Sequence, residues 1–571
     1  MQDYVKTQGM TAGGAIFARL RKLGVDYVFA NSGTDFPPVI EGLAEASAKK
    51  IKLPEAVVIP HEHAAVGMAH GYYLATGQAQ AVMLHTNVGL SNGATAAINA
   101  QNDHVPMYLM SGRTPVTEQG RFGARTVPIG WGQEMRDQSA LVREIAKWDY
   151  ELRFPEQIVE LLDRAHGIAN STPKGPVYLS LPREVLCEIC PDDKLAHEPS
   201  MAPARTAPDP AAIKEVAKLL ANAKSPLIIA QRGAGSKKSF QIFKKFVSDW
   251  AIPVCHYWCT QLILTSDHKM NVGSNPAPWI EKADVILVLD GMAPWWPDRH
   301  KPKEGCKIIQ LGPDPLFSQK PVRNFRSDIS IAGETEDIVQ VLASSMRTHL
   351  KNRKNHISVR SEKIAKVTAE IRKKSIKNAE MGSGTGMSKD WVSLCLSNAI
   401  KKRDATVFSE LGCILDPMNL KTHNRWYEIP YSGGLGWSFP AGLGYQLADR
   451  NRLVFATMGD GSYLFSNPTV CHQIAESLDL PLITIILNNR EWGAVRKSVL
   501  SIYPDGYASK ANEMPLTSLK PSPDFTFTGK ASRAHSLRVD SGDQLPDALD
   551  EAIAHWDKDK TQILLDVNVS P

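Results

Sequence analysis

The chain has 571 residues, more than one hydrophobic core usually serves, so we expect about three domains. Hydrophobic residues make up 43% and charged residues 22%, as in ordinary globular proteins, and the 65 basic and 60 acidic residues leave a net charge of only +5, which argues against nucleic-acid binding. No run of about 18 apolar residues predicts a membrane helix and the first ten residues lack a signal-peptide core, so we expect a cytoplasmic protein without membrane contact.

Three blocks of the chain alternate short apolar runs with helical periodicity, which is typical of parallel α/β sheets. We therefore predict three doubly wound parallel-sheet domains, at residues 1–188, 205–345 and 385–571. The predicted strands of the first block are "YVFANSGT", "AVVIP", "AVMLHTNVG", "MYLMSGR" and "GPVYLSLP". Those of the second are "PLIIAQRGAG", "VILVLDG" and "KIIQLGPDP", and those of the third are "ATVFSELG", "LVFATMGDG", "LITIILNN" and "ILLDVNV".

Two pairs of cysteines allow a zinc interpretation. Cys187 and Cys190 form a CxxC pair, and Cys255 and Cys259 flank "HYW". The second spacing differs from that of a common zinc knuckle. We therefore favour separate small hydrophobic side chains in a reducing compartment.

Two predicted strands of the third block end in polar residues. One ends in Gly459-Asp460-Gly461 and the other in Asn488-Asn489. Loops at the carboxyl ends of neighbouring parallel strands share a crevice, so Asp460 and Asn489 could reach one cation. A site with only a few carboxylate and amide oxygens suits Mg²⁺, because this ion completes its coordination shell with phosphate oxygens and water. Gly459 and Gly461 would let the backbone approach those phosphates, and Ser462 adds a hydroxyl at a helix start.

The "GDG…NN" pattern resembles the diphosphate motif of thiamine-diphosphate (ThDP) enzymes, and the likeness extends over nearly the whole chain. "YSGGLGWSFPAGLGYQLA" is similar to the preceding segment in the benzoylformate decarboxylase and acetolactate synthase group. The resemblance implies three domains of the ThDP-enzyme type: a pyrimidine-binding domain, a central domain and a diphosphate-binding domain. It also implies residue roles: Asp460, Asn489 and the Glu491 carbonyl as metal ligands, and Gly433 and Leu435 beside the cofactor rings.

The first block supplies the glutamate that such enzymes require. In "VVIPHEHAAVGMAHG", Glu62 ends a strand and opens a helix. Taken alone, it could be a charge favoured by the helix dipole. The resemblance instead assigns Glu62 to the aminopyrimidine ring nitrogen, where a carboxyl group favours the imino tautomer that removes the thiazolium proton.

Substrate residues are implied by the stretch "AVMLHTNVGLSNG", which resembles the corresponding loop of benzoylformate decarboxylase. The match makes His85 a catalytic and substrate-binding proton-transfer group, since both its forms are accessible near pH 7. Thr34 in "NSGTDFPP" stands where a hydroxyl contacts the substrate carboxylate. His268 in "LTSDHKMNVG" is a weaker catalytic candidate, with loop packing as its alternative.

The chain departs from both groups at several positions. Gly412 and Cys413 in "SELGCIL" replace hydroxyl residues near the diphosphate, where backbone N–H groups could still bind it. Acetolactate synthases carry a Phe-Gln-Glu element, whereas this chain has Gln133 and Glu134 after Gly132. Their small-residue loop also lacks a histidine equivalent to His85.

These features imply a ThDP- and Mg²⁺-dependent lyase or carboligase acting on 2-oxo acids or aldehydes. Decarboxylation would give an enamine that is then protonated or forms a C–C bond, as in benzoylformate decarboxylase. Two alternatives stay open, an acetolactate synthase that condenses two 2-oxo acids and a non-catalytic protein with the ThDP fold. By analogy the active site lies at the interface of a homodimer or homotetramer. FAD in the central domain is possible, but the Gly-rich turn "QRGAGS" is weak evidence for it.

Overall fold

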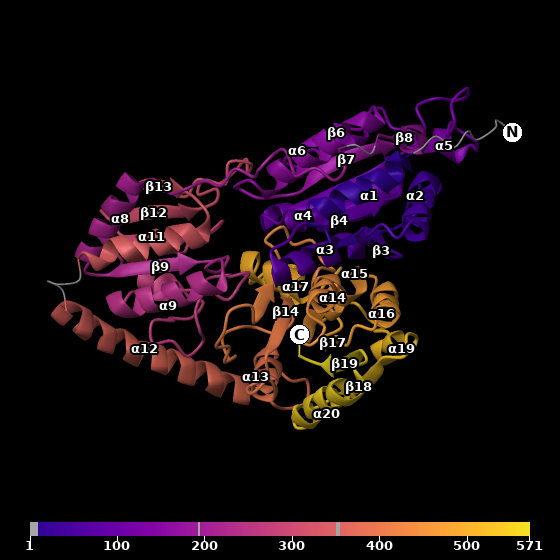
Figure 1. Ribbon diagram of the computed structural model, residues 1–571. Coiled ribbons are helices and arrows are strands. Elements are labelled where there is room, and N and C mark those ends of the chain that lie inside the picture. Colours follow the sequence, from indigo (N-terminus) through magenta and orange to yellow (C-terminus); the bar gives the residue numbers. More distant parts are fainter. Residues whose placement is uncertain (1–8, 192–193, 350–353, 571) are drawn as a thin grey trace. The chain divides into compact units, whose positions relative to one another are not determined.

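The computed structural model describes residues 9–191, 194–349 and 354–570 (Figure 1). The chain forms two compact units. Unit 1 comprises Met1–Ala204 and Pro430–Arg450, and unit 2 comprises Arg205–Ile429 and Asn451–Pro571. Each unit is described below by itself.

Unit 1 is built around a six-stranded parallel sheet with the strand order β3-β2-β4-β5-β7-β6. Its central strands are buried on both faces, which explains why they read as continuous apolar runs. A short antiparallel pair, β1 and β8, lies outside this sheet. The strands are β1 (Met10–Thr11), β2 (Tyr27–Ala30), β3 (Glu55–Val58), β4 (Gln80–Leu84), β5 (Met107–Arg113), β6 (Asp149–Glu151), β7 (Val177–Pro182) and β8 (Ile189–Cys190).

Helices cover both faces of the unit 1 sheet. Ala81 and Met83 of β4 join a hydrophobic cluster with residues of α1 and α6, whereas Leu84 faces α3 and α4. This alternation is the expected pattern for a doubly wound sheet. The helices are α1 (Ala12–Lys22), α2 (Pro37–Ala48), α3 (Glu62–Thr76), α4 (Thr86–Asn102), α5 (Ile129–Gly132), α6 (Ile158–Asn170), α7 (Arg183–Cys187) and α14 (Ser438–Ala448).

Helix α14 joins unit 1 by crossing α3 at close range. A β-carbon on Gly71 of α3 would lie 1.8 Å from the carbonyl oxygen of Ala441, and one on Gly444 would lie 2.0 Å from that of Met68. Glycine is therefore required on both helices to let the two backbones approach. Residues 430–450, which the sequence analysis assigned to the third block, thus pack with residues of the first.

Unit 2 contains two parallel sheets, with the strand orders β10-β9-β11-β12-β13 and β15-β14-β16-β17-β19-β18. Together with the sheet of unit 1 they confirm the predicted fold class of three parallel-sheet α/β domains. The strands are β9 (Pro226–Ala230), β10 (Val254–Cys255), β11 (Val285–Leu289), β12 (Lys307–Gly312), β13 (Ile329–Ala332), β14 (Ala405–Glu410), β15 (Trp426–Glu428), β16 (Leu453–Gly459), β17 (Ile483–Asn488), β18 (His535–Val539) and β19 (Ile563–Asn568).

The helices of unit 2 connect these parallel strands. Among them, α13 begins where the Ser388 hydroxyl accepts the N–H of Trp391, a regular N-cap. The helices are α8 (Pro210–Asn222), α9 (Lys237–Trp250), α10 (Ala277–Ile280), α11 (Thr335–Arg347), α12 (Lys354–Glu380), α13 (Lys389–Ala399), α15 (Asp460–Phe465), α16 (Pro468–Ser477), α17 (Gly493–Ile502), α18 (Tyr507–Lys510), α19 (Phe525–Lys530) and α20 (Leu545–Asp559).

Strand pairing in unit 2 brings three predicted site loops to one edge of a sheet. β16 pairs with β14 on one side and with β17 on the other, all in parallel. The loops that follow β14, β16 and β17 therefore share the carboxyl edge of this sheet. The assumption that the GDG and NN strands are neighbours is confirmed.

Candidate functional site

Glu62 is buried at the first position of α3, with an exposed fraction of 7%. Its Oε1 accepts a hydrogen bond from Asn31 Nδ2 at 2.9 Å, and its Oε2 accepts one from Asn92 Nδ2 at 3.1 Å. A β-carbon on Gly89 would lie 3.1 Å from Oε1, so α4 packs closely on this carboxylate. The side chain is therefore held in one position by two amides and a glycine.

His85 forms a short pair with Asp35. His85 Nδ1 lies 2.5 Å from Asp35 Oδ1, and His85 Nε2 lies 3.2 Å from Gln133 Nε2. The bond to Asp35 raises the pKa of His85. Partial burial opposes this effect, and the charges of Asp35 and Glu62 add to it. Glu62 and His85 are thus close enough to interact within unit 1, and the protonated form of His85 is favoured.

Two glycines make room for the His85–Asp35 pair. A β-carbon on Gly33 would lie 2.1 Å from His85 Nδ1, and one on Gly112 would lie 1.6 Å from Asp35 Oδ2. Neither contact is sterically possible. Glycine is therefore required at both positions for the carboxylate to reach the ring.

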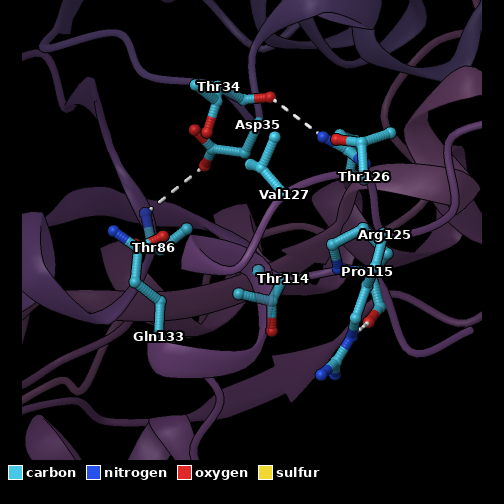
Figure 2. Close-up of a pocket in the computed structure, with 11 residues that line it drawn as sticks. Thr34, Asp35, Thr86, Thr114, Pro115, Arg125, Thr126, Val127 and Gln133 are labelled. Carbon is cyan, nitrogen blue, oxygen red and sulfur yellow. Dashed lines mark hydrogen bonds between the residues drawn. The ribbon is translucent and has the colours of Figure 1, made fainter. Parts of the chain in front are cut away.

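A small pocket next to this pair is open to solvent. Figure 2 shows Asp35 between Thr34 and Thr86, with Gln133, Thr114 and Arg125 on other sides of the pocket. The pocket lies entirely in unit 1. Its full lining is Thr34, Asp35, Thr86, Thr114, Pro115, Arg125, Thr126, Val127, Gly130, Gln133 and Arg183.

Thr86 has an unusual backbone conformation for a β-branched residue. Its φ is +41°, in the left-handed region, and its N–H donates to Asp35 Oδ2 at 3.3 Å. Its hydroxyl is buried and has no hydrogen-bond partner among the described residues. A strained residue with an unsatisfied hydroxyl at a pocket is typical of a ligand-binding position.

Arginines and acids form a charged cluster on the pocket wall. Arg125 pairs with Glu134, which also accepts hydrogen bonds from Arg113 Nη2 at 2.7 Å and from Thr114 Oγ1 at 2.7 Å. Burial favours the neutral form of Glu134, but Thr114 and Arg113 outweigh it and lower its pKa. Arg183 donates to the backbone carbonyl of Thr34 at 3.3 Å and, within the described ranges, makes no ion pair.

Gly433 and Leu435 lie in a short segment of unit 1 that is fixed by α3 and α4. Asn99 of α4 donates to the Gly434 carbonyl at 2.8 Å, and His63 Nε2 lies 3.2 Å from the Gly436 carbonyl. Gly433 has a φ of +65° and no atom within 4 Å of a β-carbon position. This segment is therefore rigid and has open space beside Gly433.

The predicted metal ligands lie together in unit 2. Asp460 begins α15 with an exposed fraction of 3%, and its Oδ2 accepts the N–H of Arg490 at 2.8 Å. Asn489 Oδ1 accepts the N–H of Glu491 at 3.1 Å, and the Glu491 carbonyl accepts the N–H of Gly493 at 2.8 Å. Burial raises the pKa of Asp460 to about 6, although backbone N–H groups oppose it. A bound cation would relieve this cost.

The glycines of the GDG loop have different surroundings. A β-carbon on Gly461 would lie 2.2 Å from the Trp492 ring, so glycine is needed there, whereas Gly459 would meet only the Leu411 carbonyl at 3.8 Å. The Ser462 hydroxyl is buried and has no hydrogen-bond partner among the described residues. The loop thus keeps a polar group available for a phosphate oxygen.

His268 lies in unit 2 with both ring nitrogens engaged locally. Its Nε2 is 2.8 Å from Ser248 Oγ, and its Nδ1 accepts the N–H of Met270 at 3.1 Å. Burial lowers its pKa to about 4, and the charge of Lys244 lowers it further. These contacts favour the alternative that the sequence left open, a histidine that packs a loop.

The cysteines show no sign of a shared metal. All eight are free thiols, and no group of three or more His, Cys, Asp or Glu side chains in the described part of the chain is arranged to hold a metal ion. Burial raises the pKa of Cys187 to about 11 and the pKa values of Cys255 and Cys259 further.

Among the described residues, no helix is long and apolar enough to cross a bilayer.

The residues present fit ThDP and a divalent cation. Unit 2 provides a buried carboxylate with a raised pKa, an amide and an unsatisfied serine hydroxyl at one sheet edge. Unit 1 provides a buried glutamate beside a histidine, and a rigid glycine segment with open space. Oxygen ligands of this kind suit Mg²⁺, and unsatisfied hydroxyls suit phosphates.

Comparison with known families identifies the class of the protein. Residues 10–141 match the N-terminal TPP binding domain of thiamine pyrophosphate enzymes, residues 213–342 match their central domain, and residues 412–567 match their C-terminal TPP binding domain. The chain therefore belongs to the thiamine pyrophosphate enzyme family. It is an enzyme of the ThDP-dependent lyase or transferase kind.

Individual relatives are distant but match over nearly the whole chain. The probable 2-ketoarginine decarboxylase AruI of Pseudomonas aeruginosa is 26% identical over 91% of this chain and 88% of its own length. Benzoylformate decarboxylase of the same organism is 23% identical, covering 95% and 97%. The probable acetolactate synthase large subunit of Methanocaldococcus jannaschii is 24% identical, covering 98% and 92%.

The fold matches a solved structure with similar coverage. A thiamine diphosphate-dependent 4-hydroxybenzoylformate decarboxylase of Rhodococcus jostii RHA1 superposes with a TM-score of 0.79 at 21% identity, over 98% of this chain and 99% of that one. The resemblance stated from the sequence is thereby confirmed at the level of family and fold.

Several residues that contact the predicted ones were not predicted from the sequence. Asn31 and Asn92 hold Glu62, and Asp35 holds His85. Asp35 directly follows Thr34, so its position offered a signal, whereas nothing in the sequence marked Thr86 as strained.

Proposed function

We propose that the chain is a ThDP- and Mg²⁺-dependent lyase or carboligase that acts on 2-oxo acids. The observation that carries this proposal is that Glu62, the His85–Asp35 pair and a polar pocket lie together in unit 1. The family match supports the cofactor. Bound ThDP would supply the nucleophilic carbon and the electron sink that decarboxylation of a 2-oxo acid requires.

Glu62 would hydrogen-bond the aminopyrimidine ring of the bound cofactor. Its two oxygens are fixed by Asn31 and Asn92, so the carboxyl group cannot rotate away from the position that the ring requires. Such fixed geometry is what general acid–base catalysis needs. Leu435 and Gly433, in the segment that Asn99 holds, would line the cofactor rings.

His85 donates a proton to the product. Asp35 raises the pKa of His85 and orients its Nδ1, and Nε2 lies beside the Gln133 amide, whose carbonyl oxygen accepts from the protonated ring once the amide is turned. Thr34 and Thr86 bind the substrate carboxylate through their hydroxyls. The unsatisfied Thr86 hydroxyl supports this role because a buried hydroxyl without a partner is costly.

The pocket favours a short 2-oxo acid with a polar or anionic substituent. Most of its lining side chains carry hydrogen-bonding groups, and two of them are arginines. An aromatic substituent such as that of benzoylformate is bound best by apolar walls. Arg183, which makes no ion pair within the described part of the chain, provides a positive charge for a distal anion.

Mg²⁺ is held by Asp460, Asn489 and the Glu491 carbonyl, and the functional assembly is a homodimer or homotetramer. The raised pKa of the Asp460 carboxyl supports a cation beside it. The family analogy alone supports the assembly. Acetolactate synthase-type condensation is the second candidate, favoured by the position of Gln133 beside His85.

The test is a substrate screen with product identification. Purified protein with ThDP and Mg²⁺ is incubated with pyruvate, glyoxylate, 2-oxoglutarate and benzoylformate, with and without an aldehyde acceptor. We expect CO₂ release with a higher kcat/KM for the polar acids than for benzoylformate. Acetolactate from pyruvate would select the second candidate. Absence of CO₂ and of any C–C product in every incubation would refute the proposal, and Glu62→Gln serves as the inactive control.

A further inference from the structure

The loop after β14 has few polar groups to offer a phosphate. A β-carbon on Gly412 would lie 2.4 Å from the carbonyl carbon of Thr457, so this residue packs directly on β16. The Cys413 N–H donates to Thr457 Oγ1 at 3.2 Å, and the Ile414 N–H donates to Ser393 Oγ at 2.9 Å. The Cys413 thiol is only 1% exposed. Neither the side chains nor these two N–H groups replace the expected hydroxyl contacts.

A lysine ammonium lies at the same place. Lys389 is the first residue of α13, and α13 leads into the start of β14, so its N-terminus lies at the carboxyl edge of the sheet. Lys389 Nζ donates to the Leu411 carbonyl oxygen. That oxygen is also the atom nearest to a β-carbon position on Gly459, at 3.8 Å. The ammonium is therefore next to the loops that follow both β14 and β16.

The charge of Lys389 has no acidic partner. Within the ranges that the structure describes, no carboxylate forms an ion pair with its ammonium. Burial lowers the pKa of Lys389, and the charge of Lys497 lowers it further, while Glu428 and Asp460 act in the opposite direction. Burial also raises the pKa of Glu428 well above its ordinary value. A partly buried cation without an ionic partner is stabilised when an anion joins it.

We propose that Lys389 binds a phosphate oxygen of the ThDP diphosphate, in place of the hydroxyl contacts that Gly412 and Cys413 cannot make. The inference rests on the proposed function, because it takes ThDP and Mg²⁺ as the ligands of this sheet edge. Ser462 supplies a hydroxyl at the following loop, and Lys389 supplies the positive charge.

A structural role is the competing explanation, since Lys389 also anchors Leu411. The two roles differ in what they require of residue 389. Anchoring needs only a hydrogen-bond donor, whereas phosphate binding needs the charge. Lys389→Gln keeps a donor and removes the charge, Lys389→Met removes both, and Lys389→Arg keeps both. Lys401→Met, which removes an exposed lysine just after α13, is the matched control.

The experiment measures the affinities of ThDP and of thiamine, which lacks the diphosphate, for the full chain in Mg²⁺ by tryptophan fluorescence. We expect Lys389→Met and Lys389→Gln to weaken ThDP about 10- to 100-fold, as for loss of a hydrogen bond to a charged group, and to leave thiamine unchanged. Lys389→Arg and Lys401→Met should bind ThDP like the parent chain. Raising the salt concentration should weaken ThDP less in the two uncharged variants than in the parent chain.

Three results would overturn the proposal. Parent-like ThDP affinity in Lys389→Gln would assign Lys389 to anchoring the loop. An equal loss of ThDP and thiamine affinity in the uncharged variants would indicate a general disturbance of the site. Parent-like ThDP affinity in Lys389→Met would exclude any role in binding. Failure of the parent chain itself to bind ThDP would instead refute the proposed function, so the two failures are distinguishable.

Discussion

The proton-transfer groups of unit 1 and the diphosphate-edge residues of unit 2 differ in how completely they are satisfied. In unit 1, both oxygens of Glu62 and both ring nitrogens of His85 have partners in the folded chain. In unit 2, the Ser462 hydroxyl is buried and has no hydrogen-bond partner among the described residues, and burial raises the pKa of Asp460. Proton-transfer groups are thus fixed in advance, whereas the diphosphate edge is left to be completed by its ligands.

The largest effect should come from Glu62→Gln, which tests the unit 1 half of this comparison. Turnover should fall about 10²- to 10⁴-fold because a positioned acid is lost. ThDP affinity should stay unchanged, since one asparagine can still donate to the new carbonyl oxygen and the other, with its amide turned, can accept from the new NH2 group. Steady-state kinetics and a binding titration measure the two quantities, with the exposed Glu55→Gln as control. A variant with full turnover would contradict the assigned role.

Asp460→Ala tests the unit 2 half. ThDP affinity in Mg²⁺ should fall about 100-fold or more. Loss of a metal ligand should cost at least as much affinity as loss of a residue that hydrogen-bonds to a metal ligand. The melting temperature of the ligand-free variant should not fall, since a buried carboxyl with a raised pKa is removed. Calorimetric titration and thermal unfolding provide the readouts. If the ligand-free variant is strongly destabilised, Asp460 is a structural residue.

Gly112→Ala asks whether the unit 1 arrangement depends on backbone space. The added methyl group must displace Asp35, which should reduce the free energy of unfolding by about 1–3 kcal/mol. Gly132→Ala is the matched control, because no atom lies within 4 Å of its β-carbon position. Chemical denaturation compares the two. Equal stability of both variants would show that Asp35 can move at little cost.

Asp35→Asn should have the smallest effect, a shift in pH dependence. In the parent chain the raised pKa of His85 means that the stabilisation by the pair is fully present below the ordinary histidine pKa of about 6.5 and is lost as pH rises through the raised value. In the variant, Asp35 no longer raises the pKa of His85, although the charge of Glu62 still does. We therefore expect the alkaline limb of activity to move to lower pH. A pH–rate profile with an unmoved limb would separate His85 from the proton step.

Much of the fold could be predicted from the sequence because buried parallel strands read as apolar runs. Every predicted strand has a counterpart, including β9 and β17. The missed strands are short or lie at sheet edges, such as β10 with two residues and β15 with three, and such segments carry too few residues for a pattern.

The candidate site was predictable where its chemistry is local and hidden where it is not. Glu62 and the Asp460 loop stand in recognisable motifs. Asp35 reaches His85 across 50 positions, and no spacing rule reports such a contact. The positive φ of Thr86 and the placement of Lys389 beside Leu411 exist only in the folded chain.

The close glycine crossing of α3 and α14 limits how this protein can be cut into modules. A fragment beginning at residue 385 would carry α14 away from the glycines of α3 that accept its backbone. A fragment ending at residue 188 would expose those same glycines to water. Domain exchange with a relative should therefore transfer residues 430–450 together with the first block, so the joints of a working chimera fall inside the third family domain.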